Sequence, residues 1–321
     1  MKKIRLAFIL LTVLLSACQK QTTGELREIT LNLTYIPNVQ FAPFYVAIEK
    51  GYFAEKGLKV SLNYGNEADL VALVGSNNQQ FMIASGEQVL LSRAQGLPVV
   101  DVLNWYKEYP VGVASLKESN ISVLTDLKGK TIGLPGLYGA NYIGFEAMAR
   151  QANLAEADYT LNSIGFTQVE ALVNKQVDAV VVYLANEPVQ LKARGYDINV
   201  LRTTDAIQLV GNGLVTNEKT IAEDPELVQA VVDALYQGIV ETARDPEAAF
   251  EICKKYVENL MAADNAIQMT VLTESIKLWQ TDKNVAGFEQ RWDNMQTVLL
   301  EIGLLKQSID VSKAWTNDFI D

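Results

Sequence analysis

Aromatic, amide and carboxylate side chains recur in this sequence directly after short apolar runs that have the composition of β-strands. Aromatic rings can stack on a flat solute, and amide groups can read its hydrogen-bond donors and acceptors. No Lys or Arg belongs to the set, so we expect a neutral or weakly cationic planar ligand rather than a sulfonate or phosphate. The candidate ligand-binding residues are Tyr35, Asn38, Phe41, Asn66, Ser85, Glu87, Trp105, Tyr138, Asn141, Tyr142, Tyr183, Asn186 and Glu187.

Each of these residues also has a purely structural interpretation. A single Tyr or Trp at a strand end commonly packs at an interface between lobes. Glu87 and Glu187 begin predicted helices, where a carboxylate offsets the helix dipole in any case. The hypothesis of a ligand site therefore depends on the whole set of aromatic residues and not on any one member.

The chain contains no histidine. No Ser–His or Cys–His nucleophile pair can form, and no imidazole is present to bind a metal. Carboxylate, Lys and Tyr side chains could still perform acid–base chemistry, so an enzyme that uses carboxylates stays open as an alternative. We expect a binding protein with no catalytic residue, no metal site and no cofactor.

The first residues have the pattern of an export signal that ends at a cysteine. Three basic residues within the first five positions precede the apolar run Leu6–Leu15, which is short for a membrane span. Leu-Ser-Ala-Cys18 then has the pattern of a bacterial lipobox. We expect a signal peptide over residues 1–17, acylation of Cys18, and a polar linker over residues 18–28 that tethers the protein to the outer face of the cell membrane. An ordinary signal peptide with an incidental cysteine, or a short uncleaved anchor, is the alternative.

The charge of the exported chain is strongly negative. Removal of residues 1–17 takes away three basic residues and no acidic ones, which leaves 24 Lys plus Arg against 38 Asp plus Glu and a formal net charge of −14. This charge argues against nucleic acid and anionic lipid headgroups as partners. Cys253 is the only thiol left after acylation of Cys18, so no intramolecular disulfide is expected.

The elements that would position the candidate residues alternate between strand-like and helix-like segments. A first cycle has strands at 29–35, 58–64, 80–84 and 99–105, with helices at 42–50, 67–75 and 86–95. A second cycle has strands at 111–116, 130–134, 159–163, 179–183 and 198–201, with helices at 139–151, 166–175 and 186–194. After a short strand at 214–216 the chain is helical to its end, and Asp-Pro-Glu begins helices at Asp224 and Asp245.

This alternation predicts an α/β fold with two lobes, each a mostly parallel sheet covered on both faces. The first lobe would contain residues 29–110 and 215–321, with the helical tail packed back on it, and the second lobe residues 111–214. The chain would cross between lobes near residues 109–112 and 211–216, where glycines could absorb a hinge rotation. Ligands of open parallel sheets bind beyond the carboxyl ends of the strands, so the candidate residues would face one another between the lobes of a monomer.

Several stretches resemble one known family. Tyr-Ile-Pro-Asn at residues 35–38, Phe-Ala-Pro-Phe-Tyr-Val-Ala at 41–47 and Glu-Lys-Gly-Tyr-Phe-Ala-Glu-Lys-Gly-Leu at 49–58 resemble the opening of the NMT1/THI5-like solute-binding proteins. Asp-Leu-Lys-Gly-Lys-Thr-Ile-Gly-Leu-Pro-Gly at 126–136 and Gly-Phe-Thr-Gln at 165–168 continue the resemblance, which covers residues 29–257. It implies the type II periplasmic-binding-protein fold, with two lobes that close on a small molecule and deliver it to the permease and ATPase subunits of an ABC importer.

Within the family, the stretches 135–142, 163–168 and 186–190 look most like the riboflavin-carrier branch. The resemblance thus implies a lipoprotein for riboflavin uptake, whose isoalloxazine would need an aromatic clamp and amide partners. A carrier for an aminomethyl- or hydroxymethyl-pyrimidine is the alternative, with Glu87 or Glu187 paired to an amine. Sulfonate carriers are disfavoured by the missing basic residues. The enzymes of the family use a histidine and a cysteine-rich motif that this chain lacks.

Overall fold

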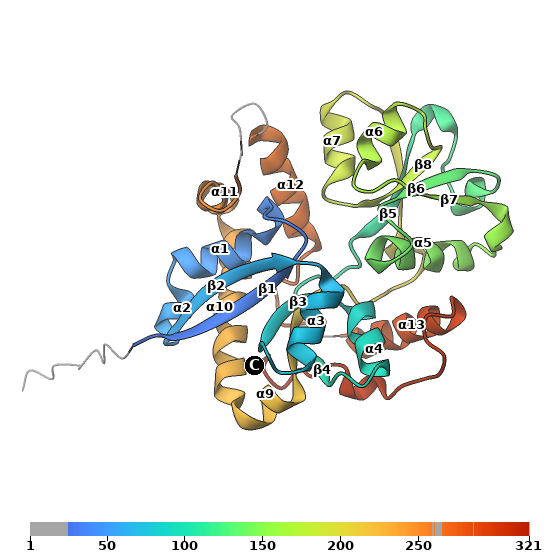
Figure 1. Ribbon diagram of the computed structural model, residues 1–321. Coiled ribbons are helices and arrows are strands. Elements are labelled where there is room, and N and C mark those ends of the chain that lie inside the picture. The colour runs from blue at the N-terminus through green and yellow to red at the C-terminus, as the bar shows by residue number, and fades with distance from the viewer. Residues whose placement is uncertain (1–24, 259, 261–264, 285, 321) are drawn as a thin grey trace, which may run out of the picture.

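The computed structural model describes residues 25–258, 260, 265–284 and 286–320. Cys18 and the predicted signal peptide lie outside these residues. The described chain forms two five-stranded sheets, each flanked by helices, side by side in two lobes (Figure 1). This arrangement confirms the predicted two-lobed α/β fold. The lobe boundaries after residues 110 and 214 remain predictions.

The first sheet has the strand order β2-β1-β3-β10-β4. Its strands are β1 (Arg27–Thr34), β2 (Leu58–Gly65), β3 (Phe81–Ser85), β4 (Val99–Asn104) and β10 (Asn212–Asn217). The connecting helices are α1 (Ala42–Glu49), α2 (Tyr52–Glu55), α3 (Glu67–Gly75) and α4 (Gly86–Ala94), with a 3-10 turn at Val39–Phe41. β3, in the centre of the sheet, and β4, at its edge, are both buried along their whole lengths. The outer side of β4 is covered by the tail, where Asp101 forms a bridge to Trp315.

The second sheet has the order β7-β6-β8-β5-β9. Its strands are β5 (Val111–Leu116), β6 (Thr131–Leu134), β7 (Thr160–Ser163), β8 (Ala179–Tyr183) and β9 (Ile198–Arg202). The helices of this lobe are α5 (Gly139–Gln151), α6 (Gln168–Val173), α7 (Glu187–Ala193) and α8 (Thr203–Ala206). Short 3-10 turns lie at Lys117–Ser119, Leu124–Leu127 and Glu156–Asp158.

One strand in each sheet runs against the others, which the sequence did not predict. β10 pairs antiparallel with β3 and β4, and β5 pairs antiparallel with β8 and β9. Both strands begin where the chain has just crossed from the other lobe. A chain that enters at the edge where the parallel strands end must run away from that edge, and its direction is therefore reversed.

The tail contains α9 (Glu218–Glu223), α10 (Pro225–Arg244), α11 (Pro246–Cys253), α12 (Asn265–Leu278), α13 (Phe288–Glu301) and a 3-10 turn at Val311–Lys313. The predicted helix starts are confirmed, because the Asp224 carboxylate accepts from Leu227 N and that of Asp245 from Ala248 N. α10 and α11 pack on α1, and α13 packs on α4, so the tail packs on the first lobe as expected. In addition, α12 contacts α7 and α13 contacts α5 of the second lobe.

The apolar cores extend across the lobe boundary. The core that contains Phe44, Trp105 and Trp279 of the first lobe also includes Ala185 and Val189 of the second. The two lobes are therefore packed on each other in this structure. Of the helices that the structure describes, none combines the length and the apolar composition that a membrane crossing requires.

Candidate binding site

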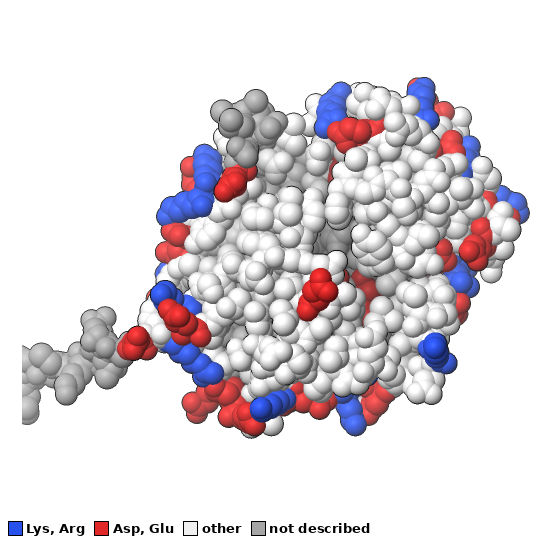
Figure 2. Space-filling model, viewed as in Figure 1, with Lys and Arg blue, Asp and Glu red and all other residues white. Residues whose placement is uncertain are grey.

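The carboxyl ends of strands from both sheets meet between the lobes. The Tyr35 ring, just beyond β1, lies 5.2 Å from the Phe166 ring, which lies between β7 and α6. Leu184 N, just beyond β8, donates to Pro110 O in the first crossing segment. Figure 2 shows the surface hollowed between the two lobes, and most atoms that border the hollow on this face belong to uncharged residues.

Two carboxyl groups and a serine of the first lobe lie close to Tyr109 and Tyr183, and we call them the carboxyl cluster: Glu67, Ser85 and Glu87. Glu67 begins α3, and its Oε1 accepts from Ser85 N at 2.6 Å and from Ser85 Oγ at 2.8 Å. Glu87 lies in the first turn of α4 and is 1% exposed. Among the described residues, neither carboxylate oxygen of Glu87 has a hydrogen-bond partner.

Burial dominates the electrostatics of the carboxyl cluster. It raises the pKa of Glu87 to about 8, and the nearby charge of Glu67 contributes to the increase, while hydrogen bonding by its own backbone N–H, Ser85 and Tyr109 opposes it. Burial also raises the pKa of Glu67, although the two hydrogen bonds from Ser85 oppose this effect. The site therefore favours the protonated form of its carboxyl groups unless a partner compensates the charge.

Two tyrosines lie close to the carboxyl cluster. Tyr109, in the first crossing segment, donates its hydroxyl to Ala140 O of α5 at 3.1 Å. Tyr183 ends β8 in the second lobe. The pKa of each tyrosine is raised, first by burial and then by the charge of Glu87. Glu87 thus faces aromatic groups from both the crossing segment and the opposite lobe.

A second polar group lies nearer the surface. Glu187 begins α7 and accepts from Tyr183 N at 2.8 Å and from Asn186 Nδ2 at 3.0 Å. Burial raises the pKa of Glu187 to about 7. Tyr35 adopts a left-handed backbone conformation with a φ of 77° and is 42% exposed. Its pKa is raised by burial and then by the Glu187 charge, which connects the two lobes at this point.

The four candidate amides have local structural roles. Asn38 and Asn66 cap the turns that follow them, with side chains that accept from Gln40 N and Ala68 N at 3.0 Å each. Asn141 Nδ2 donates to Val181 O at 3.1 Å, inside the second lobe. Asn186 accepts from Gln190 Nε2 in addition to its bond to Glu187.

The candidate aromatic residues do not all converge. Trp105 is 2% exposed and packs within the first lobe, with ring centroids 6.0 Å from Phe41 and 5.7 Å from Trp279. Tyr138 is 66% exposed at the start of α5. Tyr142 lies near Glu146, whose charge contributes to its raised pKa after burial. Ligand contacts by these residues remain predictions.

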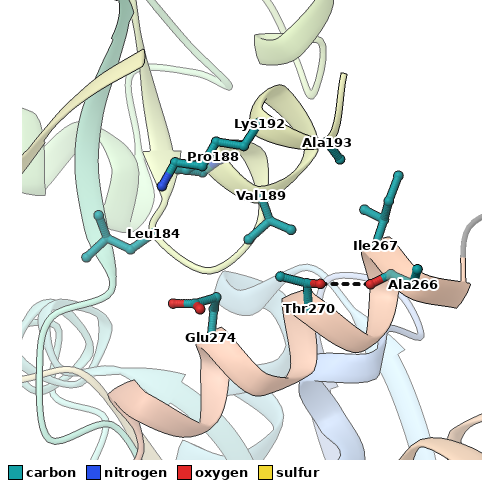
Figure 3. A pocket seen from close by; sticks show the side chains of 9 residues that line it. All are labelled: Leu184, Pro188, Val189, Lys192, Ala193, Ala266, Ile267, Thr270 and Glu274. Carbon is teal, nitrogen blue, oxygen red and sulfur yellow. Dashed lines mark hydrogen bonds between the residues drawn. The ribbon is translucent and has the colours of Figure 1, made fainter. Parts of the chain in front are cut away.

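A pocket of about 450 Å³ lies between α7 of the second lobe and α12 of the tail. In Figure 3 the Val189 and Ile267 side chains point into the space between the two helices. This volume lies within the range of small-molecule sites. The pocket has one basic and one acidic residue, Lys192 and Glu274, in an otherwise apolar and weakly polar lining. It is lined by Leu184, Pro188, Val189, Lys192, Ala193, Ala266, Ile267, Thr270 and Glu274.

Sequence reasoning missed Glu67, Tyr109 and the α12 side of this pocket. Glu67 was detectable, because it follows the candidate Asn66 at the end of β2 and begins a helix. Tyr109 lies in a segment that was identified as a crossing. The position of α12 depends on long-range packing of the tail, for which the local sequence has no signal.

Comparisons with known proteins agree with the fold and identify the family to which the chain belongs. The NMT1/THI5-like family model matches residues 38–249. The riboflavin-binding protein RibY of Chloroflexus aurantiacus is 36% identical, over 92% of this chain and 86% of that protein. A formylaminopyrimidine-binding protein of Halalkalibacterium halodurans is 30% identical, over 78% of each.

Among solved structures, the periplasmic aliphatic sulphonate binding protein SsuA of Escherichia coli superposes with a TM-score of 0.73. The match covers 91% of this chain and 92% of that one at 14% identity, so it shows a shared fold alone. The family match covers most of the two lobes, and RibY matches nearly the whole chain. This chain belongs to the NMT1/THI5-like family.

Proposed function

We propose that this protein is the extracytoplasmic, lipid-anchored binding protein of an ABC importer, and that its ligand is riboflavin. The observation that carries the proposal is the 36% identity to the riboflavin-binding protein RibY over 92% of the chain. Cys18 would hold the acyl chains and residues 18–28 would be the linker. The permease and ATPase would receive the ligand from the monomer.

The chemistry between the lobes supports a flat, uncharged ligand. Tyr35 and Phe166 lie at its rim, and Tyr109 and Tyr183 lie near the carboxyl cluster. An isoalloxazine ring combines a large stacking face with an edge of hydrogen-bonding groups, which such a set can bind. Lys192 is the one basic residue in the lining of the α7–α12 pocket, and Glu274 opposes it, so a phosphate or a sulfonate has little support there.

A thiamine-pyrimidine precursor is the second candidate. The formylaminopyrimidine-binding relative and the buried carboxyl groups Glu87 and Glu187 favour it, because a carboxylate can pair with an amine. An enzymatic role has weaker support. The chain has no histidine, whereas the enzymes of the family that it resembles depend on one.

Fluorescence titration of the exported chain with riboflavin at two ionic strengths tests the proposal. We expect flavin fluorescence to be quenched at micromolar protein, with an affinity that salt hardly changes, since the ligand is uncharged. A pyrimidine amine would bind more weakly at high salt and at low pH, as its carboxylate partner is screened or protonated. No quenching by riboflavin, together with a clear thermal shift from a pyrimidine, would favour the second candidate.

A further inference from the structure

Among the buried carboxyl groups that the structure describes, Glu87 is the one with both oxygens unpartnered. It is 1% exposed, and among the described residues its two oxygens have no hydrogen-bond partner. A buried acceptor without a donor bears its full desolvation penalty, and a charged one bears more. The packed arrangement of the lobes is therefore incomplete at this point without another donor.

The polar neighbours of Glu87 are largely committed elsewhere. The Ser85 hydroxyl donates to Glu67 Oε1, and the Tyr109 hydroxyl donates to Ala140 O. Both hydroxyls also lie near enough to Glu87 to lower its pKa, but neither makes a contact of full hydrogen-bond geometry with its oxygens. The titratable groups whose charges reach this position are Glu67, Tyr109 and Tyr183, which come from α3, the crossing segment and β8. In the part of the chain that the structure describes, no cationic side chain contributes to the pKa of Glu87, so no salt bridge there replaces the missing donor.

The surroundings specify the shape of the missing group. Tyr109 of the crossing segment and Tyr183 of the second lobe lie close to the carboxyl cluster. Because aromatic rings stack on flat groups, we expect the missing donor to belong to a planar ligand. A flat heterocycle presents N–H donors in the plane of its ring. Both candidate ligands do so, since riboflavin has an imide N–H and the pyrimidine precursors have an exocyclic amino group.

We propose that Glu87 accepts a hydrogen bond from an N–H on the ring edge of the bound heterocycle and so determines which heterocycles the site accepts. The inference rests on the proposed binding of a heterocycle between the lobes. A ligand without this N–H leaves Glu87 buried and unpartnered, and the closed complex loses the corresponding free energy. The site then rejects a ligand without the N–H because such a ligand leaves the Glu87 acceptor unsatisfied, as in other sites that are built around a buried polar group.

A cycle of protein and ligand changes tests the proposal. Riboflavin and 3-methylriboflavin, which lacks the imide N–H, are titrated against the exported chain and its Glu87→Met variant, which has a similar volume and no strong acceptor. We expect methylation to weaken binding to the unmodified protein roughly 5- to 150-fold, as for a buried acceptor that is left without its donor. In Glu87→Met the same methylation should change affinity by about twofold or less. An equal loss in both proteins would show a steric effect and overturn the inference.

Glu87→Gln is the conservative variant, because its amide oxygen can still accept from the N–H, and it should retain discrimination against 3-methylriboflavin. If Glu87→Met does not fold, loss of discrimination in Glu87→Gln at full riboflavin affinity would overturn the inference. Asp101→Asn is the matched control, since Asp101 is also buried with an unpartnered oxygen but lies on β4, the edge strand of the first sheet that the tail covers. Its ratio of affinities for the two flavins should equal that of the unmodified protein.

The proposed function and this inference can fail separately. If riboflavin does not bind but an aminopyrimidine does, the same cycle is run with the aminopyrimidine and its N,N-dimethyl derivative. Dependence of that discrimination on Glu87 would support the inference while the riboflavin proposal falls. Tight riboflavin binding that ignores both the methyl group and Glu87 would support riboflavin and overturn the inference.

Discussion

Asp101 and Glu87 are buried carboxyl groups of the same lobe with different surroundings. Asp101 Oδ1 accepts from Leu103 N at 3.1 Å, while Oδ2 has no partner among the described residues. Burial raises the pKa of Asp101 from its ordinary value of 3.8 to about 8. Glu87 faces the other lobe, whereas Asp101 lies beside Trp315 of the tail. We therefore expect Asp101 to affect folding and Glu87 to affect ligand binding.

Replacement of Asp101 by Asn should change how stability depends on pH. Between pH 4 and 8 the unfolded chain ionises Asp101 while the folded chain keeps it protonated, so the folded state binds more protons and loses stability as pH rises. Asn cannot ionise, and by pH 8 the variant should be more stable than the unmodified protein by roughly 1–3 kcal/mol. Urea unfolding at pH 4.5, 6 and 8 measures the difference. A difference that is the same at all three pH values would contradict the assignment.

Cys18 is the residue on which membrane attachment depends, and it lies outside the described residues. Acyl chains on this cysteine would contribute roughly 0.8 kcal/mol per buried CH₂ group, and no described helix offers another apolar anchor. Cys18→Ser should therefore give a folded protein that no longer sediments with membranes. Cell fractionation followed by riboflavin titration of the released protein tests both parts. A variant that still sediments with membranes would disprove the lipid anchor.

At the scale of elements, the predicted starts of α10 and α11 depend on local chemistry. Asp245 accepts from Ala248 N at 3.0 Å and precedes Pro246 at the first helical position. Loss of such a cap typically costs about 1 kcal/mol. Asp245→Ala should lower the free energy of unfolding by about that amount, as measured by urea denaturation. Asp245→Asn, which keeps a capping oxygen, should lose much less, and an equal loss in both variants would point to charge instead of capping.

Local signals explain why so many elements could be predicted. The strand at 111–116 and the helix at 139–151 have the predicted bounds, since apolar periodicity and flanking glycines are encoded within each segment. The strand at 214–216 was also predicted, yet its place between β3 and β4 was not. Position within a sheet depends on partners over a hundred residues away, and no single segment encodes it.

The same division holds for the candidate site. The rule that ligands bind beyond strand ends identified Ser85, Glu87 and Tyr183, which the structure brings to one interface. It could not separate them from Trp105, which also ends a strand but is enclosed by Phe41, Phe44 and Trp279. Residues at equivalent strand ends differ in which neighbours cover them, and this depends on tertiary packing.

For the whole molecule, the packed lobes connect ligand binding to proton binding. Glu87 is buried where the lobes meet, and an opening of the lobes would return it to water. Its pKa would then fall from about 8 towards its ordinary value of 4.5. Glu67 and Glu187 share the interface, and burial raises the pKa of each. The closed form thus binds more protons than the open form at neutral pH.

The ligand-free protein should therefore close as the solution becomes more acidic. Between pH 8 and 5 the closed form keeps a proton on Glu87 that the open form has lost, so lowering the pH shifts the population towards the closed form. Small-angle X-ray scattering of the exported chain should show a radius of gyration that decreases over this range. Glu87→Met should respond less to pH, because only Glu67 and Glu187 remain as interface carboxyl groups whose pKa values burial raises. Asp101→Asn should behave as the unmodified protein does, since Asp101 is buried in either form. A radius of gyration that increases on acidification, or that responds to pH equally in Glu87→Met, would mean that lobe closure does not depend on the protonation of Glu87.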